Sequence, residues 1–544
     1  MAHRTALAAG LLALSVLWIG CQGPTTDRTQ APVADSPVDG DRLIIPIDSD
    51  PPSLDFVTCT DGWCLLVARF VADFLVDDGE HLETVPRLAT SWAFSEGGRV
   101  LTFHLRPGVR WHDGAPFSAR DVLFTYHRVM DPASGARTDM FQDIEEVSAL
   151  DDLTVRVKYR EPNILALDAW KRPLVPEHLL QSVAPGTKDP ARRPIGTGPF
   201  RFARWERGRE IVLEANRDYF LGRPHLDELV FKIIPSPSTQ FQALLAGETD
   251  WTTIPPSEWA GTAAGAEFKR RFQVYEYPAQ FLFYIAWNER NPLFGDPRVR
   301  RAMTLALDRE GFVKKVYSGA GLVAASSFHP SQFGFDPAIQ PLPHEPEKAA
   351  RLLDDAGWKQ GAAGGLRRRD GKEFRFSLLI FQSNPVYQQI ASLLVDGLGR
   401  LGIGVDVRAL DFPALLDRLR RRDFEAAMSG WLLTSEDPTA FFHSDPSHGS
   451  SNYAGYSNSE MDRLVIQGRH EMDPEKRRGI YRRVQELEAA DQPYTFLFFP
   501  VIRVALESRF RGVLASPVAS PLKPYPGPLQ WYVPAKLQKR QEPP

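Results

Sequence analysis

The side chains of this 544-residue chain that could serve as nucleophiles or phosphate cradles lack the spacing that such chemistry requires. No Gly-x-Ser-x-Gly elbow, His-Glu-x-x-His zinc motif or Cys–His pair in a family context occurs in the sequence. Gly196 and Gly198 form a Gly-x-Gly, but Arg201 stands where a dinucleotide fingerprint has its third glycine. Because Pro199 follows, a turn into a strand is favoured. We therefore expect no enzyme, with a lipid-anchored hydrolase as the lesser alternative.

Two histidines and a carboxylate, His443, Asp445 and His448, are of the types that bind transition metals. Their spacing matches neither a helix pair nor a strand pair, and Pro446 lies between them. A metal site is the weaker hypothesis here, and we expect no metal and no cofactor.

Cys59 and Cys64 flank a loop short enough to be closed by a disulfide bond. Such a bond persists in an oxidising compartment, and we predict it for this pair. A zinc site is the lesser alternative, because no histidine lies nearby in the sequence.

The first twenty residues are typical of a secretory signal peptide. A short positive start precedes an apolar run, Leu7 to Gly20, which is too short to span a bilayer comfortably. The run ends at Cys21 in a pattern similar to a bacterial lipobox, although Trp18 stands where leucine is usual. We predict a signal peptide over 1–20, lipidation of Cys21 and a flexible tether over 21–40. Plain secretion and a retained anchor are the alternatives.

The amino-acid composition limits the classes of protein to which this chain can belong. The chain is 43% hydrophobic and 24% charged, which is typical of a globular protein rather than a disordered or multi-span membrane protein. It carries 64 basic and 68 acidic residues, a net charge of -4, so nucleic acid is not an expected partner. The length predicts about three lobes.

Residues 86–132 combine a strand, tight turns and a capped helix. Leu101, Phe103 and Leu105 alternate with polar residues, as in a half-buried strand. Ser118 and Asp121 have the spacing of a capping box at the start of a helix that ends before Pro132.

The amino-acid sequence of residues 86–132 resembles the signature of the family 5 extracytoplasmic solute-binding proteins, the oligopeptide, dipeptide and nickel receptors of ABC importers. The matching residues are Leu88, Ala89, Ser91, Trp92, Thr102, Phe103, Leu105, Arg106, Gly108, Val109, His112 through Phe117, Ala119, Asp121 and Val122. Further matches are Gly196 to Phe200 and the Val-Arg-x-Ala pattern that begins at Val299 and ends at Asp308-Arg309.

The resemblance implies an α/β fold of the periplasmic-binding-protein type, a clamshell (type II, cluster C) of two α/β lobes plus an extra domain. The implied parts are lobe I (41–82, 195–286 and 496–535), extra domain II (83–194) and lobe III (287–495), with hinge strands at 284–288 and 495–499. Within lobe III, helices alternate with strands at 374–381, 402–407 and 424–431, which predicts a mostly parallel sheet.

The loop that follows residues 424–431 matches the family's Gly-Trp loop ending in Asp-Pro. In peptide-binding members, an aspartate three residues after this Trp431 pairs with the peptide's α-amino group. Thr434 occupies that position here, and a hydroxyl does not balance an ammonium charge. Either Glu436 or Asp437 takes over the charge, or the ligand has no free amine at that place.

Trp431 is our main candidate for an aromatic wall of the ligand site, with a core tryptophan as the alternative. The other ligand-binding candidates are Ser53, Asn384, Tyr453 and Trp287. Local turn-making is the competing role for Tyr453 and its neighbours.

The resemblance implies a lipid-anchored, periplasmic or otherwise extracytoplasmic monomer that passes peptides or a peptide-like solute to ABC permease and ATPase subunits. A receptor for an oligosaccharide, an opine or a metal chelate is one alternative. A stand-alone sensory or chaperone-like binding protein is another, and nothing in the sequence separates it from the first.

Overall fold

A computed structural model describes residues 36–539, apart from 60, 80–82, 137, 186, 188–192, 362–363, 383, 434, 515–526 and 528. The elements below all belong to the unit Pro37–Pro544. The predicted signal peptide, Cys21 and most of the predicted tether lie outside the described residues, as does Thr434. No helix in the described part of the chain is long and apolar enough to cross a membrane.

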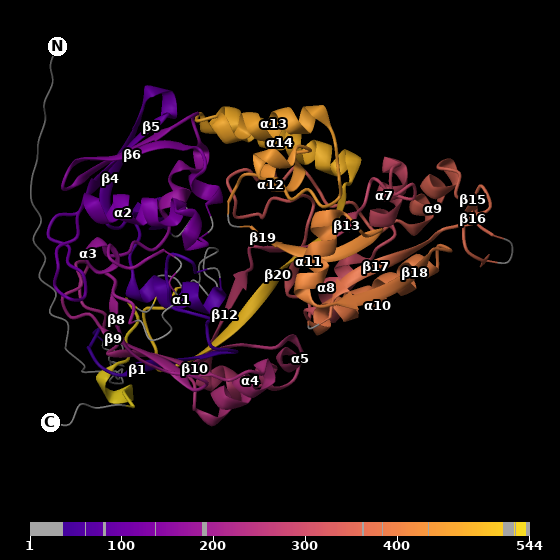
Figure 1. Ribbon diagram of the computed structural model, residues 1–544. Helices are drawn as coiled ribbons and strands as arrows, with labels where there is room; N and C mark the ends of the chain where they lie inside the picture. The colour runs from indigo at the N-terminus through magenta and orange to yellow at the C-terminus, as the bar shows by residue number, and fades with distance from the viewer. Residues whose placement is uncertain are drawn as a thin grey trace, which may run out of the picture. The chain divides into compact units, whose positions relative to one another are not determined.

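The first sheet has four strands in the order β1-β10-β9-β8 (Figure 1). Their bounds are β1 (Arg42–Ile47), β8 (Phe200–Glu206), β9 (Glu210–Ala215) and β10 (Glu228–Ile233). β1 pairs with β10 in parallel and the other pairs are antiparallel. Helix α1 (Gly62–Val71) is capped by Asp61, whose carboxylate accepts the amides of Trp63 and Cys64. A disulfide bond joins Cys59, just before this helix, to Cys64 in its first turn.

A second four-stranded sheet lies within residues 83–194, in the antiparallel order β4-β5-β7-β6. Its strands are β4 (Ala89–Ser95), β5 (Val100–Leu105), β6 (Ile144–Asp151) and β7 (Thr154–Tyr159). The strand and the helix expected around Phe103 and Val122 are β5 and α2 (Ala119–Met130). The predicted capping box of Ser118 and Asp121 is confirmed, with both reciprocal hydrogen bonds present.

The third and largest sheet has eight strands. Its path runs β11 (Trp251–Thr253), β20 (Tyr494–Glu507), β13 (Phe281–Trp287), β19 (Ala426–Leu432), β17 (Arg375–Phe381) and β18 (Gly404–Leu410). β12 (Phe272–Pro278) and β14 (Gly321–Val323) also pair with β20.

The three strands expected to alternate with helices, β17, β18 and β19, pair in parallel, as predicted. β13 and β20, which lie outside that predicted set, run antiparallel to their neighbours. The reason is connectivity: β17 and β18 are joined by a helical crossover, but β13 and β20 enter the sheet as extended segments from outside it.

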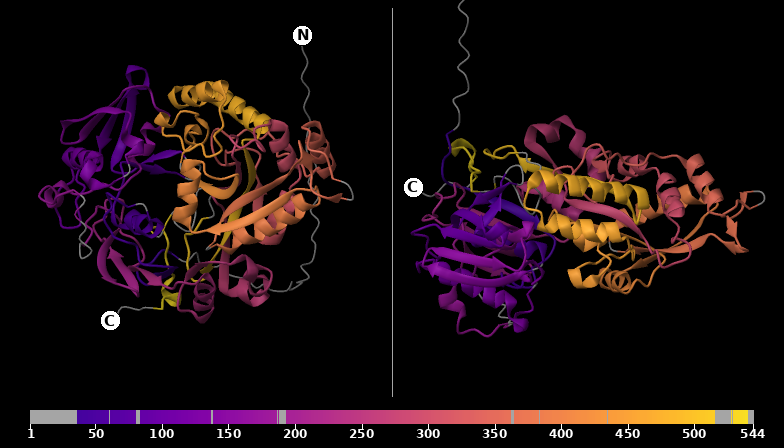
Figure 2. Two further views of the ribbon diagram at one scale, coloured as in Figure 1. Left: turned by 45° about the vertical axis from the view of Figure 1, so that its right-hand side comes forward. Right: turned by 90° about the horizontal axis from the view of Figure 1, so that it is seen from above.

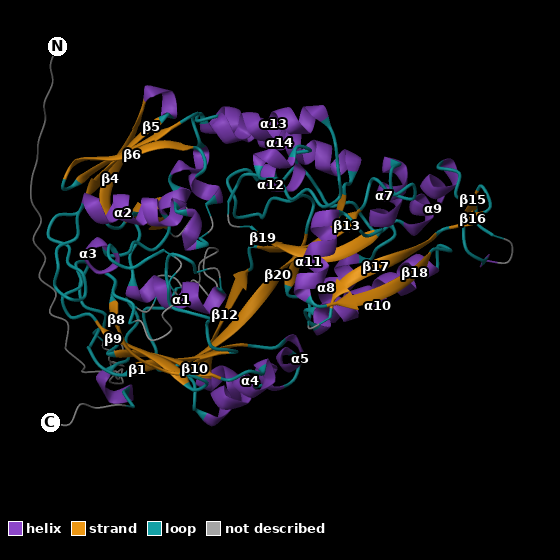
Figure 3. Ribbon diagram, in the orientation of Figure 1, coloured by secondary structure: helices purple, strands orange, loops and turns teal. Residues whose placement is uncertain are grey.

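Two apolar layers cover the faces of this sheet, as the alternation along β13 requires. Phe283, Ile285 and Trp287 belong to one buried cluster, and Leu282, Tyr284 and Ala286 to the other. The first cluster is covered by α7 (Pro297–Leu305), α8 (Arg309–Val316), α9 (Pro346–Asp355) and α10 (Pro385–Gly399). The second is covered by α11 (Phe412–Arg421), α12 (Thr439–Phe442), α13 (Ser459–His470) and α14 (Pro474–Asp491). Figure 3 shows these helices against the strands, and α13 packs along α14 (Figure 2).

The remaining elements are short. They are β2 (Val76–Asp78), β3 (Thr84–Pro86), α3 (Glu177–Leu180), α4 (Pro237–Ala246), α5 (Pro256–Trp259), α6 (Ala266–Arg271), the hairpin β15 (Arg368–Arg369) and β16 (Lys372–Glu373), and several single-turn 3-10 helices.

Strand β20 changes partner along its length. Its first half pairs with β13 and its second half, from Val501, pairs with β12. The two chain segments that pass this point together are therefore 278–283 and 498–501. They lie within a few residues of the predicted hinge strands, and the domain boundaries stay a prediction.

Candidate functional site

The Gly-Trp pair at the end of β19 is shaped by an aromatic ring from the neighbouring strand. A Cβ atom added to Gly430 would lie 2.0 Å from Cζ of Phe281, so any larger residue would displace that ring. Leu433 N donates to the carbonyl of Gln280 at 2.8 Å, which continues the pairing with the chain before β13. The loop that begins at Leu433 is thus anchored at the point where β12 passes into β13.

Trp431 lies in the apolar layer over the sheet. It is 6% exposed, and its ring stacks on Phe441 at 4.0 Å and lies 4.1 Å from the ring of Tyr284. Tyr494 meets the same ring edge-on at 4.7 Å. Among the described residues its Nε1 has no hydrogen-bond partner. In this state Trp431 packs as a core residue, and its role as a ligand wall stays a prediction.

The adjacent carboxylates Glu436 and Asp437 have different surroundings. Asp437 is 5% exposed and forms an ion pair with Arg469, with Nη2 and Nε at 2.6 and 2.7 Å. It also accepts the amide of Thr439 at 2.9 Å at the start of α12. Asp437 therefore holds α12 against α13.

Glu436 is half-buried, and its Oε1 accepts the amide of Phe333 at 2.5 Å. Burial raises the pKa of this carboxyl above its usual value, opposed by the Phe333 hydrogen bond and by Arg477. Asp168 and Lys171 also act on its charge, the first raising and the second lowering the pKa of Glu436. Both belong to residues 83–194, so charges in that part of the chain act on Glu436.

Other contacts join residues 83–194 to the helices of the third sheet. Nδ1 of His470 lies 2.5 Å from the carbonyl oxygen of Pro162, and Ile164 packs on the cluster that contains Trp431. Met472 lies so close to Gly98 that a Cβ there would be 2.9 Å from its Cγ. The sequence reasoning missed these contacts, because no local pattern marks them.

The remaining ligand candidates have local structural partners. Trp287 is fully buried and its Nε1 donates to Oγ1 of Thr495 at 3.0 Å. Asn384 caps α10 by accepting the amide of Val386, and Ser53 Oγ accepts the amide of Asp55. Tyr453 is half-buried against the cluster that contains Trp431. Of the predicted set, Trp431 lies at the end of β19 with Glu436 and Asp437 in the loop that follows, Tyr453 packs on the same apolar cluster, and Trp287 lies in the core of the third sheet.

The signature histidine of residues 86–132 is a structural clamp. His112 Nε2 lies 2.9 Å from the carbonyl of Gly198, and its Nδ1 accepts the amide of Gly196 at 3.3 Å. Burial lowers the pKa of His112 to about 4, so the neutral ring is the form held here. Gly196 is required because a Cβ would lie 1.8 Å from the carbonyl oxygen of Val71.

The metal hypothesis gains no geometric support. Across the described residues no group of three or more His, Cys, Asp or Glu side chains is arranged to hold a metal ion. The His443 and His448 rings lie 4.2 Å apart, and Nδ1 of His443 accepts the amide of Asp445.

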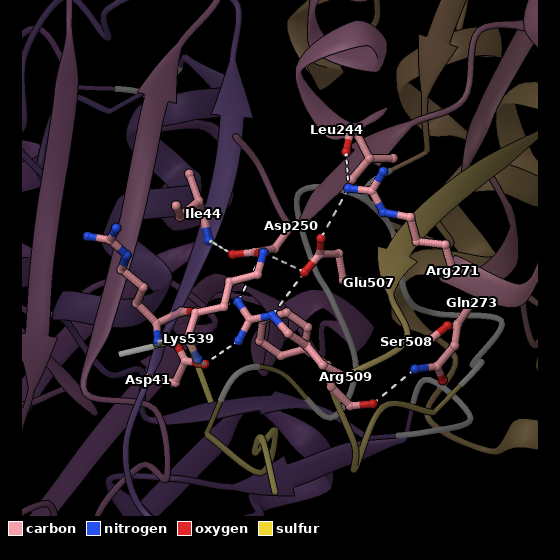
Figure 4. Close-up of polar contacts among 12 residues, drawn as sticks. Asp41, Ile44, Leu244, Asp250, Arg271, Gln273, Glu507, Ser508, Arg509 and Lys539 are labelled. Atoms are coloured by element: carbon pink, nitrogen blue, oxygen red, sulfur yellow. Dashed lines mark hydrogen bonds and ion pairs between the residues drawn. The ribbon is translucent and has the colours of Figure 1, made fainter. Parts of the chain in front are cut away.

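A buried ionic cluster ties the two ends of the folded chain together (Figure 4). Arg509 pairs with Asp41, with Asp250 at 2.8 Å and with Glu507 at 2.9 Å. Lys539 reaches Glu507 at 2.7 Å. All three carboxylate side chains are at most 9% exposed, so the cluster fixes the end of β20 beside β1.

A separate cavity of about 820 Å³ lies beside α8, β14 and β20, lined mainly by apolar side chains including Leu322, Phe335 and Phe499. None of the described ligand candidates lines it.

Comparisons with known proteins bear on the whole chain. The model of the bacterial extracellular solute-binding proteins, family 5 (middle region), matches residues 83–453. The chain belongs to this family. Family 5 members are binding proteins rather than enzymes and are extracytoplasmic, as expected from the sequence.

Relatives of this family 5 chain include the oligopeptide-binding protein AppA of Bacillus subtilis (strain 168), which is 31% identical over 517 residues, 92% of this chain and 94% of AppA. Heme-binding protein A of Haemophilus influenzae is 28% identical over 79% of this chain and 82% of its own. The solved structure of AppA in complex with a nonapeptide superposes with a TM-score of 0.76, at 29% identity, covering 92% of this chain and 100% of that one. The predicted clamshell-type α/β fold is confirmed.

Proposed function

We propose that this protein is the solute receptor of an ABC importer, and that its solute is a peptide bound between the loop 433–438 and residues 83–194. The similarity to an oligopeptide-binding protein over nearly the full length of both chains carries the proposal. The carboxyl group of Glu436 and the aromatic residues that pack around Trp431 at the end of β19 support the proposal.

Binding by closure suits a chain whose parts are joined by two adjacent segments. A ligand that contacts both the loop 433–438 and residues 83–194 makes all its contacts only when these two parts approach each other. Binding therefore shifts the protein toward the closed form. Near-complete switching needs about 5.5 kcal/mol of differential affinity. We place the hinge at 278–283 and 498–501, where β20 changes partner.

The same proposal includes a lipid anchor at Cys21 of the mature protein and delivery of the solute to a permease. Both rest on the leader-like residues 1–21 and on the family. Globomycin treatment of the producing cell, which blocks lipoprotein signal cleavage, should leave an unprocessed precursor.

A non-peptide solute such as a metal chelate is the second candidate, since a heme-binding protein is among the relatives. Native mass spectrometry of protein purified without refolding separates the two. A ladder of peptide masses is the expected result, whereas one discrete mass without an amine would favour the second candidate. Protein that carries no solute and binds none from a peptide digest would refute peptide binding.

A further inference from the structure

The cavity of about 820 Å³ beside α8 is bordered by an open strand edge. In the described part of the chain, β14 (Gly321–Val323) pairs with β20 on one side and with no strand on the other. All three residues of β14 line the cavity, and the side chain of Leu322 is 42% exposed. Sites for small ligands typically measure about 300–1,000 Å³. The cavity is therefore large enough to hold a ligand against this edge.

The outer edge of β14 presents backbone groups that a further strand could bind. Ala324 N donates to Leu497 O on β20 at 3.2 Å. Alternate residues of an antiparallel pair bond to the neighbouring strand, so Gly321 and Val323 turn their backbone groups away from β20. The nitrogen and oxygen of Val323 and the oxygen of Gly321 have no hydrogen-bond partner among the described residues. One donor and two acceptors are thus left for a group that enters the cavity.

The walls of the cavity are held in place by Arg309, a buried residue at the start of α8. Its guanidinium donates to Ala324 O at 3.0 Å, just after β14, and to Leu342 O at 2.5 Å, just after the lining residues 339–341. A third hydrogen bond, to Phe496 O at 2.6 Å, joins both walls to β20. The cavity is therefore preformed, which lowers the entropic cost of binding a ligand.

Two exposed side chains of opposite charge, Glu310 and Lys314, also line the cavity. They lie one turn apart on α8, and neither forms an ion pair among the described residues. The rest of the lining is mainly apolar and includes Val313, Phe335 and Phe499. A short free peptide carries an ammonium and a carboxylate group close together, whereas a segment inside a longer chain carries neither terminal charge. The two charges therefore favour a free peptide as the ligand.

We propose that this cavity is a second peptide site, in which a short free peptide with apolar side chains adds to the outer edge of β14 as a further strand. The backbone groups of Gly321 and Val323 bind the main chain of the peptide, and Glu310 and Lys314 bind its charged ends. None of the lining residues belongs to the loop 433–438, so this site is separate from the proposed solute site.

Val323→Pro tests the strand edge. Proline removes the outward N–H donor but leaves the ladder with β20 intact, because residue 323 does not bond to that strand and proline is tolerated at such an edge. Val323→Ala is the matched control, since it keeps the donor. Lys314→Gln removes one charge from an exposed position of α8, and the neighbouring Lys315→Gln is its control. Thermal melting verifies that the variants are folded, and Lys314→Gln carries the test if Val323→Pro is not.

Native mass spectrometry counts the molecules of trivaline that each protein binds, and hydrogen exchange of residues 318–325 reports where they bind. Wild type, Val323→Ala and Lys315→Gln should bind two molecules, with slower exchange at 318–325. Val323→Pro should bind one. Lys314→Gln should bind the second molecule roughly tenfold more weakly, because it loses a charge-assisted contact. Trivaline acetylated at one end and amidated at the other should leave exchange at 318–325 unchanged.

The outcomes separate this inference from the proposed function. If wild type and Val323→Pro each bind one molecule, without a change in exchange at 318–325, the second site is refuted and the proposed solute site stands. Val323→Pro that still binds two molecules, or Lys314→Gln with unchanged affinity, also refutes the second site. If wild type binds one molecule and Val323→Pro none, the cavity is supported and trivaline binding at the proposed solute site is refuted.

Two further results would overturn the inference. Wild type that binds no trivaline refutes the second site outright. Blocked trivaline that slows exchange at 318–325 as the free peptide does would refute a free peptide as the ligand, and would indicate a segment of a longer chain instead.

Discussion

Replacing Trp431 by alanine tests whether this ring serves the core or the ligand. The indole is 6% exposed and makes close ring contacts with Phe441, Tyr284 and Tyr494. Truncating a buried tryptophan removes its transfer free energy and leaves a cavity, together about 3–5 kcal/mol. This cost includes part of the free energy of the lost ring–ring contacts, which contribute about 0.5–1.5 kcal/mol each. We therefore expect Trp431→Ala to lower the stability of the third-sheet region by about 3–5 kcal/mol.

The assay is thermal unfolding together with hydrogen exchange of β13, β19 and the first half of β20, because a chain of several lobes need not unfold in one step. Trp431→Phe is the matched variant, since it keeps a ring against Phe441 and should lose less than half as much. Peptide affinity is measured on the same samples. Unchanged melting and exchange combined with lost affinity would refute the core assignment and make the ring a ligand wall.

Three further perturbations follow from the described contacts. Arg509→Ala leaves Asp41, Asp250 and Glu507 buried, and the described cations that remain beside them are Lys539 and Arg271, which lies 3.6 Å from Glu507. The substitution should cost about 3–5 kcal/mol, seen as faster exchange at the end of β20. Protection equal to wild type there would contradict the buried ionic cluster. His112 has a folded pKa of about 4, below the value of about 6.5 expected in the unfolded chain, so its contribution is complete above pH 6.5 and declines by about 3 kcal/mol as the pH falls to 4. In His112→Gln the melting temperature should depend less on pH within that window. A variant whose melting temperature depends on pH as that of wild type does would refute the stabilising role of the His112 contacts. Mutating both Cys59 and Cys64 to serine should cost about 2 kcal/mol through the short loop they close, and reduction of the wild type should reproduce that loss if the bond is the cause.

Features that depend on a few consecutive residues could be predicted from the sequence alone. Ser118 and Asp121 form the expected capping box because both partners lie within one turn of the same helix. The family and the α/β fold were likewise recognisable from the sequence motifs around His112 and Trp431. The spacing of Cys59 and Cys64 predicted the disulfide bond that the structure contains.

Features that depend on which distant segments meet needed the tertiary structure. Alternation of helices and strands predicted the parallel pairing of β17, β18 and β19, but it gives no information on extended segments such as β13 and β20, which join the sheet antiparallel from another part of the chain. Asp437 and Glu436 are neighbours in sequence, yet Asp437 forms an ion pair with Arg469, thirty-two residues away, whereas Glu436 accepts the backbone amide of Phe333. Arg509 meets Asp41 across 468 residues. Local patterns set the geometry of single turns and helices, whereas burial and charge pairing depend on long-range contacts that no short window of sequence contains.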